Sequence, residues 1–441
     1  MNDALNIGPY LNIGLYYAAP TVLILAIYAW LQRLRTQRNL HARAVSIADG
    51  MHEPASLHPV IDPNRCLGCG TCVSACPEHD VLGLIHHKAE LIAAANCVGH
   101  GACATACPTH AITLVFGTET RGVDIPHIKP NFETNVPGIF IAGELGGMGL
   151  IRNAVQQGAQ AVGSIRTLLR ERHNCALDLV IVGAGPAGIA AALAAKEAGL
   201  KFVIVDQDSL GGTVAHFPRQ KIVMTAPAKL PIIGEVKFRE TTKEALLKFW
   251  QDVVAQQQLK INFGERLEHV EHAAPGFNAI TSKNRYHART VLLCLGRRGT
   301  PRQLGVPGEE LSKVVYRLID PEQYRGQNVL VVGGGDSAIE AAVSIAEQEQ
   351  TQVTLSYRSN AFARVKAKNR ERLEAMVANK RMRVLLSSQV QAIAPDKVVI
   401  AADERTMEIE NDAVIVCAGG ILPTQLLEKI GVAIETKFGV A

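Results

Sequence analysis

Cysteine and histidine side chains recur at two matching spacings within a short part of the 441-residue chain. Seven of the ten cysteines lie between Cys66 and Cys107, which indicates metal or cluster ligation and not a disulfide framework. The first run, which ends in Cys-Pro, has the candidate ligands Cys66, Cys69, Cys72 and Cys76. The second run, which also ends in Cys-Pro, has Cys97, His100, Cys103 and Cys107. Closely spaced thiolates can wrap an iron–sulfur cluster, and two interleaved runs of this form favour clusters over zinc.

This stretch, about residues 58 to 115, resembles the bacterial two-cluster ferredoxins. In that family the fourth Cys of each run ligates the other cluster. The resemblance therefore implies two 4Fe-4S clusters with crossed ligands. The first would be held by Cys66, Cys69, Cys72 and Cys107, and the second by Cys97, His100, Cys103 and Cys76. The remaining histidines of the region fit no ligand position and are expected on loops or at the surface: His79, His86, His87 and His110.

His100 departs from the family pattern, because it stands where the family has a Cys. Imidazole ligates iron in some iron–sulfur proteins, so the spacing favours His100 as a ligand of the second cluster. Two alternatives stay open: a 3Fe-4S cluster with His100 unbound, and a 4Fe-4S cluster whose fourth ligand is water. A neutral imidazole in place of a thiolate removes one negative charge, which should raise the reduction potential of that cluster.

A glycine-rich turn follows the apolar strand expected at residues 179–182. Gly183, Gly185 and Gly188 form a G-x-G-x-x-G pattern, with Pro186 and Ala187 between the last two glycines. Such a turn offers backbone N–H groups to a pyrophosphate at the start of a helix. The next apolar strand ends at Asp206, an acid placed to bind an adenosine ribose hydroxyl. The whole pattern predicts a dinucleotide site.

A second turn follows the strand expected at residues 328–332 and contains Gly333, Gly335, Asp336 and Ser337. The next strand ends at Ser356, where a site for NADH would have an acid. Arg358 can instead meet a 2′-phosphate, with Arg364 or Lys366 in support, so the sequence favours NADPH. The alternative for Arg364 and Lys366 is the solvated start of a helix.

Two such turns about 150 residues apart resemble the thioredoxin-reductase-like flavoproteins, which bind FAD at the first turn and NADPH at the second. That family closes with a segment similar to residues 132–144, which here precedes the first turn. We therefore expect a circular permutation that moved about residues 119–172 ahead of Cys175. By the resemblance, further FAD contacts would come from Gly143, Glu144, Arg152, Asn153, Ala154, Gly211 and Gly212. The family usually has Asp in place of Glu144.

The redox dithiol of the thioredoxin reductases is missing. They carry a C-x-x-C pair just before the second turn, whereas residues 313–326 of this chain contain no Cys. The usual route of disulfide reduction is thereby excluded, and the region looks more like the ferredoxin–NADP reductases built on the same scaffold. Hydride exchange between NADPH and FAD, followed by single-electron relay through the two clusters, is the expected chemistry.

The N-terminal part of the chain predicts a membrane anchor. Residues 4–32 carry no charge, and Leu11 to Leu31 is long enough to cross a bilayer as a helix. Arginines follow at once from Arg33, which predicts a single pass with the later domains in the cytoplasm, at a bacterial inner membrane. A cleaved signal peptide would need a basic region before the apolar run. The net charge is +4, and basic and acidic residues are well mixed along the chain. No basic block indicates binding to nucleic acid.

These elements predict an α/β fold with two Rossmann-like domains, for FAD and NADPH, an α+β two-cluster ferredoxin-like domain and a transmembrane helix. The expected domains are residues 1–45 (anchor and basic juxtamembrane segment), 46–118 (ferredoxin-like), 119–172 (permuted closing segment), 173–300 (FAD-binding), 301–410 (NAD(P)H-binding) and 411–441 (return to the FAD domain).

The expected function is a membrane-anchored oxidoreductase that exchanges electrons between NADPH and a redox partner protein or quinone. One alternative is an electron-transfer subunit of a larger membrane complex. Another is a reductase of low-molecular-weight disulfides that needs no enzyme dithiol. The expected assembly is a homodimer or a subunit of such a complex.

Overall fold

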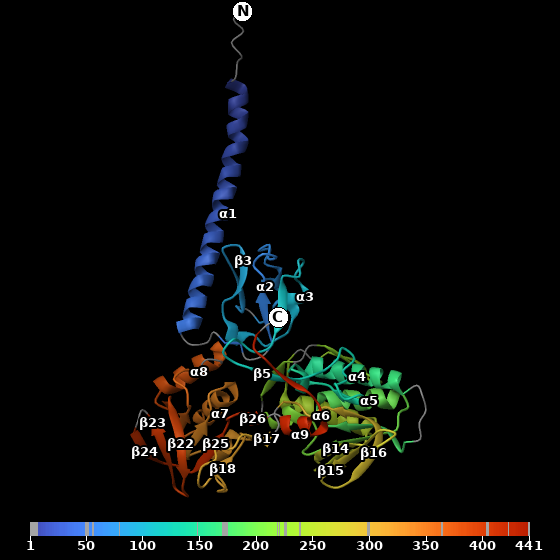
Figure 1. Cartoon of the computed structure of the whole chain (residues 1–441). Helices are drawn as coiled ribbons and strands as arrows, with labels where there is room; N and C mark the ends of the chain where they lie inside the picture. Colours follow the sequence, from blue (N-terminus) through green and yellow to red (C-terminus); the bar gives the residue numbers. More distant parts are fainter. Residues whose placement is uncertain are drawn as a thin grey trace, which may run out of the picture.

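The computed structural model describes residues 8–48, 53–54, 57–78, 80–147, 149–169, 175–217, 219, 221–224, 227–237, 240–297, 300–362, 365–402, 405–421 and 423–439. A single long helix, α1 (Gly8–Ala48), extends away from the other domains (Figure 1). Its side chains Val22, Leu23, Ile24 and Leu25 are 60–65% exposed. Among the described residues, α1 has the length and composition needed to cross a membrane, as signal sequences and some core helices also do.

The C-terminal part of α1 packs against the next domain. Asn39 Nδ2 donates a hydrogen bond to the Leu84 carbonyl at 2.9 Å, and Arg43 pairs with Glu90 at 2.5 Å. The helix therefore continues three residues beyond the predicted anchor segment and is fastened to the domain that follows.

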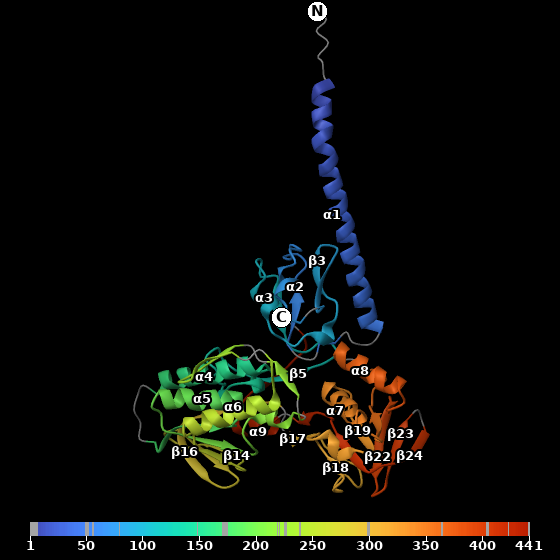
Figure 2. The same cartoon turned by 180° about the vertical axis from the view of Figure 1, so that it is seen from behind.

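That domain is small and built on two antiparallel strand pairs. β1 (His58–Ile61) pairs with β4 (Ile112–Val115), and β2 (Leu82–Ile85) pairs with β3 (Lys88–Leu91). Two short helices, α2 (Thr71–Ala75) and α3 (Ala102–Thr105), follow the glycines of the two cysteine runs. Its core contains the buried Cys66, Cys72, Cys97 and Cys103. The domain lies over the junction between the two larger domains in both views (Figures 1 and 2).

The first large domain has a seven-stranded sheet in the order β13-β8-β7-β16-β15-β14, with β6 also paired to β16. Its strands are β6 (Ile139–Ile141), β7 (Leu177–Val182), β8 (Phe202–Asp206), β13 (Ile261–Phe263), β14 (Leu267–His272), β15 (Phe277–Thr281) and β16 (Arg285–Leu293). Its helices are α4 (Ile151–Leu168), α5 (Pro186–Glu197) and α6 (Lys243–Gln256). The pairs β6–β16–β7–β8–β13 are parallel, as in a Rossmann-like sheet.

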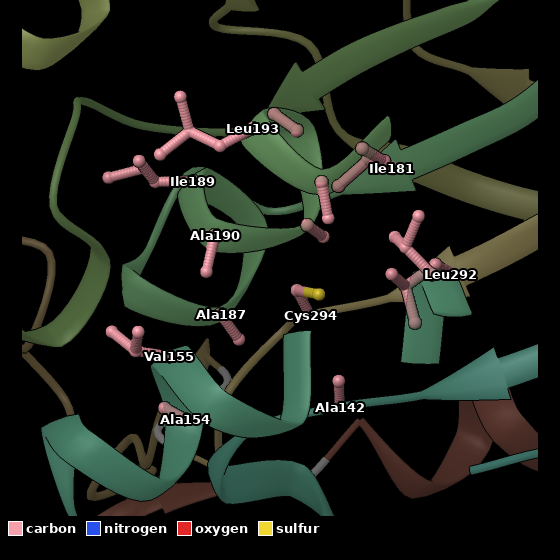
Figure 3. Packing of buried hydrophobic residues seen from close by; sticks show 14 of the residues in the cluster. Ala142, Ala154, Val155, Ile181, Ala187, Ile189, Ala190, Leu193, Leu292 and Cys294 are labelled. Atoms are coloured by element: carbon pink, nitrogen blue, oxygen red, sulfur yellow. The ribbon is translucent and has the colours of Figure 1, made fainter. Parts of the chain in front are cut away.

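The segment before Cys175 is part of the core of this domain. β6 lies alongside β16, and Ala142 and Ala154 share one buried cluster with Ala187 of α5 and Cys294 (Figure 3). Helices α4 and α5 approach so closely that a Cβ on Gly158 would lie 2.1 Å from the Ala187 carbonyl oxygen. The segment that precedes the first turn in sequence is therefore folded into the domain that the turn belongs to.

The second large domain has a parallel sheet in the order β18-β25-β19-β20-β21. Its strands are β18 (Val314–Val315), β19 (Asn328–Val332), β20 (Gln352–Ser356), β21 (Met382–Leu385) and β25 (Ala413–Val416), with helices α7 (Asp336–Ala346) and α8 (Ala367–Ala378). A three-stranded antiparallel sheet adds β22 (Ser388–Ile393), β23 (Lys397–Ala402) and β24 (Arg405–Glu410). The predicted boundary at 410 is wrong in this respect: β25 pairs with β18 and β19, so the domain extends through Val416.

The chain then returns through β26 (Gly420–Ile421), which pairs with β17 (Thr300–Pro301). Helix α9 (Thr424–Ile430) follows, and β27 (Ile434–Lys437) pairs antiparallel with β5 (Val123–Pro126). The first domain has two further antiparallel strand pairs. β9 (Ile222–Met224) pairs with β12 (Glu240–Thr242), and between them in sequence β10 (Ala228–Leu230) pairs with β11 (Gly234–Val236). The predicted class, mixed α/β with Rossmann-like parallel sheets and a ferredoxin domain, is confirmed.

Candidate functional site

The first glycine turn is shaped for close approach of backbone to backbone. Gly183 has φ +111°, and a Cβ there would lie 2.4 Å from the Cys294 carbonyl oxygen. A Cβ on Gly188 would lie 1.8 Å from the Gly183 carbonyl oxygen, so α5 packs directly against the turn. Pro186 occupies the first turn of α5, where its missing N–H removes no hydrogen bond. A helix start of this kind offers free N–H groups, which suit a pyrophosphate.

Asp206 lies beside this turn at the end of β8. Its carboxylate is buried and accepts hydrogen bonds from the backbone N–H groups of Ala184 at 2.5 Å and Asp208 at 2.7 Å. Desolvation raises the pKa of Asp206, and these hydrogen bonds oppose that shift. Gly212 also lies here, since a Cβ on it would come within 3.1 Å of Gly185 Cα. The predicted FAD contacts of the first domain are therefore adjacent in space.

The closing segment brings its predicted residues to the same edge of the sheet. Gly143 has φ +86° and donates its N–H to Gln157 Oε1 at 2.8 Å, and a Cβ there would lie 3.0 Å from the Ala187 Cβ. The three residues predicted to face the flavin occupy the first turn of α4: Arg152, Asn153 and Ala154. Arg152 is exposed and Ala154 is buried. Gly143, Ala154 and Ala187 thus lie against one another, and we call the region around them the predicted flavin surface.

Arg297 belongs to this surface and was not identified from the sequence. Its guanidinium Nη2 donates to the Asp124 carbonyl at 3.1 Å. Desolvation lowers the pKa of Arg297, whereas the negative charges of Glu144 and Asp124 oppose that shift. The arginine is therefore within electrostatic range of Glu144, a predicted FAD contact. The sequence signal for Arg297 is its position just after the apolar strand β16 and Gly296.

The second glycine turn repeats the geometry of the first. Gly333 has φ +149° and a Cβ there would lie 2.4 Å from the Cys417 carbonyl oxygen. A Cβ on Gly334 would lie 2.2–2.3 Å from atoms of the Tyr357 ring, so the ring packs directly on this glycine. Asp336 opens α7, but its Oδ1 accepts the Lys366 N–H at 3.0 Å and Asn369 Nδ2 at 2.8 Å. Asp336 therefore fastens the start of α8 to the turn.

The end of β20 presents the residues predicted to select the nucleotide. Ser356 is buried, and its hydroxyl lies 2.8 Å from the Ser388 hydroxyl. Arg358 is exposed two residues later. Gly335 is the residue before α7, and Ser337 is the second residue of the helix. Arg364 lies outside the described residues.

The predicted ligands of the first cluster lie together; we call Cys66, Cys69, Cys72 and Cys107 the first cluster site. Desolvation raises the pKa of Cys72 to about 11, and Cys66 and Cys69 are among the thiols that add to this shift. Hydrogen bonds with Thr71 lower the pKa of Cys69, and the nearby Cys107 thiol opposes that shift, which places the last Cys of the second run beside the first run. Two backbone N–H groups point at sulfur: Ala89 to Cys66 at 3.5 Å and Ala111 to Cys107 at 3.3 Å. Such N–H···S bonds are typical around iron–sulfur clusters.

The second group lines one small cavity; we call Cys76, Cys97, His100 and Cys103 the second cluster site. Within the described part of the chain, no three Cys, His, Asp or Glu side chains converge as ligands of a single metal ion. Ligands spread around a cavity suit a cluster better than one zinc ion, which needs four ligands around a single point. The residues present therefore fit two clusters with crossed ligands.

His100 lies in this cavity, half-buried. Desolvation lowers its pKa, the charge of Glu78 opposes the shift, and the charges of Arg152 and Lys366 add to it. The histidines predicted on loops behave as expected where they are described: His86, His87 and His110 all occupy left-handed turn positions. His79 lies outside the described residues.

Comparisons with known proteins agree with this geometry. The family described as pyridine nucleotide-disulphide oxidoreductase matches residues 180–439, and the 4Fe-4S dicluster domain matches residues 58–108. The chain is 28% identical over 267 residues to bacilliredoxin reductase Bdr of Bacillus subtilis, covering 59% of this chain and 82% of that protein. It is 31% identical over 271 residues to a ferredoxin–NADP reductase of Thermus thermophilus, covering 58% of this chain and 77% of that protein.

Among solved structures, the bacillithiol disulfide reductase Bdr of Staphylococcus aureus has the same fold over 59% of this chain and 81% of its own. The TM-score is 0.52 and the sequence identity is 24%.

Proposed function

Because this chain belongs to the pyridine nucleotide-disulphide oxidoreductase family and carries a 4Fe-4S dicluster domain, it is an FAD-dependent NAD(P)H oxidoreductase, and we propose that it works as a membrane-anchored electron-transfer enzyme specific for NADPH. Electrons pass between NADPH and a membrane or protein partner, either a quinone or a redox protein. The 31% identical relative named ferredoxin–NADP reductase supports this class of reaction.

The observation that carries the proposal is the packing of the dicluster domain on the FAD domain. Phe116, directly after β4, lies on Gly147, because a Cβ on Gly147 would come within 2.5 Å of the Phe116 ring. Gly147 follows Gly143 and Glu144, the predicted flavin contacts of the closing segment. The predicted cluster sites and the flavin surface thus belong to two domains in direct contact.

The chain's own residues supply binding and orientation. The turns at Gly183 and Gly333 receive the two pyrophosphates, and Arg358 receives the 2′-phosphate of NADPH. The two cluster sites hold 4Fe-4S clusters, the second with His100 as one ligand. When bound, FAD exchanges a hydride with NADPH and single electrons with the clusters.

No enzyme dithiol is needed for this route. Residues 313–326 contain no Cys. Cys294 is buried in the FAD-domain core, where desolvation raises its pKa to about 12, so its thiol stays protonated. The electrons therefore leave the flavin through the dicluster domain.

Membrane attachment through α1 is supported by the exposure of its apolar side chains. Tyr17, Leu23 and Trp30 are each at least 60% exposed, whereas the core helix of a soluble protein buries its apolar residues. Arg33 and Arg35 follow the apolar stretch, which supports a single pass with the domains on the cytoplasmic side of a bacterial inner membrane.

A circular permutation of the family scaffold accounts for the order of the segments. β27 pairs with β5, and the Gly439 N–H donates to the Phe116 carbonyl at 2.8 Å. The C-terminal strand therefore ends beside the start of the closing segment, which is the arrangement expected where an ancestral connection was cut.

Anaerobic titration of the purified chain with NADPH tests the function. We expect bleaching of the visible flavin absorbance, then loss of the broad cluster absorbance, and turnover with ferricyanide as acceptor. If NADPH leaves the flavin oxidised, the chain is an electron-transfer subunit that receives electrons from elsewhere.

The relative named bacilliredoxin reductase supports disulfide reduction in general, and the second candidate is a reductase of low-molecular-weight disulfides that needs no enzyme dithiol. Loss of both clusters distinguishes the two functions. Disulfide reduction by NADPH would survive in a chain without clusters, whereas electron relay to an external acceptor would stop.

A further inference from the structure

The two cluster sites lie at opposite ends of the strand pair β1–β4. At the first end, the Asp62 N–H donates to the Ala111 carbonyl at 2.8 Å and the Cys66 N–H donates to the Asp62 carbonyl at 3.0 Å. At the other end, Pro59 and its partner Leu114 line the cavity of the second cluster site. Since a strand advances about 3.3 Å per residue, β4 leads from the first site to the second.

The end of β4 at the second site is the end that meets the FAD domain. Phe116 lies two residues beyond Leu114, and its ring packs on Gly147. The Phe116 carbonyl also accepts the Gly439 N–H of the C-terminal strand. From Leu114 at the second cluster site, two residues of backbone lead to Phe116, and the Phe116 ring contacts Gly147 of the closing segment.

The small domain as a whole lies over the junction of the two larger domains in both views (Figures 1 and 2). The second cluster site, at the Phe116 end of β4, is therefore the one on the side of the FAD domain.

The first cluster site is directed elsewhere. It adjoins the β2–β3 hairpin, where Lys88 Nζ donates to the Cys66 carbonyl at 2.7 Å. The same hairpin receives Asn39 and Arg43 of α1. Cys69 is exposed and its neighbour Leu67 is 73% exposed, so this site is open to a partner.

The geometry points to a fixed order of the two sites: the His100 site exchanges electrons with the flavin, and the first site exchanges them with the external partner. This order rests on the proposed function. With the cofactors bound, NADPH would give a hydride to FAD and become NADP⁺; the reduced flavin would then give one electron to each cluster and release the proton to solvent, so one NADPH would reduce both clusters and leave the flavin oxidised.

Two sets of substitutions in the full-length chain test the order. Cys66→Ala/Cys69→Ala/Cys72→Ala removes the first site, and Cys97→Ala/Cys103→Ala removes the second. Each sample is mixed with NADPH without oxygen, frozen within milliseconds and examined by EPR for a reduced cluster. In parallel, dithionite reduces whatever cluster is present, and flavin bleaching by NADPH is recorded.

We expect the variant without the first site to reduce its remaining cluster as fast as the unmodified chain. The variant without the second site should reduce its remaining cluster at least tenfold more slowly with NADPH, although dithionite still reduces it. The reverse pattern, or equal rates, overturns the proposed order. Absent flavin bleaching in the unmodified chain would instead refute the proposed function, which keeps the two failures distinct.

A matched pair of single substitutions keeps the test valid if a cysteine variant does not fold. Glu78 lines the cavity of the second site, and Lys88 Nζ donates to the Cys66 carbonyl at the first. In mediator titrations without NADPH, Glu78→Gln should raise the potential of the His100 cluster alone, and Lys88→Gln should lower that of the other cluster alone. His100→Cys identifies which EPR signal belongs to the second site. With NADPH, Glu78→Gln should quicken the first electron transfer out of the flavin, and Lys88→Gln should leave it unchanged. The opposite result contradicts the order.

Discussion

Gly158 of α4 and Ala187 of α5 lie in direct backbone contact, with room for no Cβ between them. A methyl group on Gly158 would come within 2.1 Å of the Ala187 carbonyl oxygen, 2.9 Å of its carbonyl carbon and 3.1 Å of its Cα. Ala187 lies in the first glycine turn. The packing of the closing segment is therefore coupled to the predicted pyrophosphate site.

Gly158→Ala should destabilise the FAD domain. The two helices would have to separate, at a cost of about 1–3 kcal/mol. Gly163→Ala in the same helix is the control, because a Cβ there meets nothing within 4 Å. That change should be neutral or stabilise by up to about 1 kcal/mol. Thermal release of FAD, followed by its fluorescence, measures both effects, and equal melting temperatures for the two variants would contradict the close packing.

The features of this molecule that depend on local spacing could be predicted from the sequence. The cysteine runs indicated a dicluster domain and the glycine turns indicated Rossmann-like domains, because the backbone geometry of these motifs is set within a few residues. One cavity is lined by Cys76 of the first run together with Cys97, His100 and Cys103 of the second.

The contacts that depend on distant segments could not be predicted. Phe116 on Gly147 and Arg297 beside Glu144 bring together residues 31 and 153 positions apart, which no periodicity encodes. The strand at 413–416 was assigned to the wrong domain for the same reason. An apolar run predicts a strand, but only its pairing with β18 and β19 shows which sheet it joins.

Arg358→Ala should remove most of the preference for NADPH over NADH. Arg358 is exposed at the end of β20, while Ser356 is buried against Ser388 and supplies no acid for a ribose hydroxyl. A charge-assisted phosphate contact contributes about 1.5–3 kcal/mol, or roughly ten- to a hundredfold in affinity. Flavin-reduction rates at low nucleotide concentration measure this. Arg383→Ala, on the neighbouring strand β21, is the control and should leave the ratio unchanged. Equal rates with both nucleotides in the unmodified chain would refute the assignment.

Glu309→Gln should destabilise the NADPH-binding domain at neutral pH but not in acid. The Glu309 carboxylate accepts hydrogen bonds from Leu304 N at 2.5 Å, Gly305 N at 2.7 Å and Tyr316 Oη at 2.9 Å. Desolvation alone would raise the pKa of Glu309. These hydrogen bonds lower it by more than desolvation raises it, so the pKa of Glu309 lies below its ordinary value. A carboxylate with a depressed pKa contributes stability above its unfolded pKa and loses it as pH falls through the folded value.

The expected loss for Glu309→Gln is about 1–3 kcal/mol at pH 7. It should shrink as the pH falls below the ordinary Glu pKa of about 4.3 and through the lowered pKa of the folded chain, where the unmodified carboxyl becomes protonated too. Melting temperatures at pH 7 and along this acid series measure it. Glu310→Gln, at the exposed neighbouring position, serves as control and should change neither. A loss for Glu309→Gln that does not depend on pH would show that the ionised carboxylate is not what stabilises the turn.

Two truncations should separate the two parts of α1. A chain that starts at Leu34 lacks the apolar stretch but keeps Asn39 and Arg43, which contact the β2–β3 hairpin. It should leave the membrane fraction and keep flavin and both clusters. A chain that starts at Ala44 loses these two contacts as well, so amide hydrogen exchange in β2 should quicken and the adjoining first cluster should be lost more readily. If the Leu34 chain remains with membranes after a salt wash, α1 is not what attaches the protein.

His100→Cys should lower the reduction potential of one cluster and leave the other unchanged. His100 lines the same cavity as Cys76, Cys97 and Cys103, at the spacing of a missing thiolate. A thiolate in its place adds one negative charge at the second site, which favours the oxidised cluster. Iron analysis of the unmodified chain comes first, because a 3Fe-4S cluster would mean that His100 is unbound.

His100→Ala is the companion variant. If His100 is a ligand, the alanine form should lose one iron from the second site, and the cysteine form should keep it. A four-iron cluster with water as fourth ligand predicts instead that alanine changes neither the iron content nor the potential. If cysteine and alanine both leave the iron content and both potentials unchanged, His100 is not a ligand.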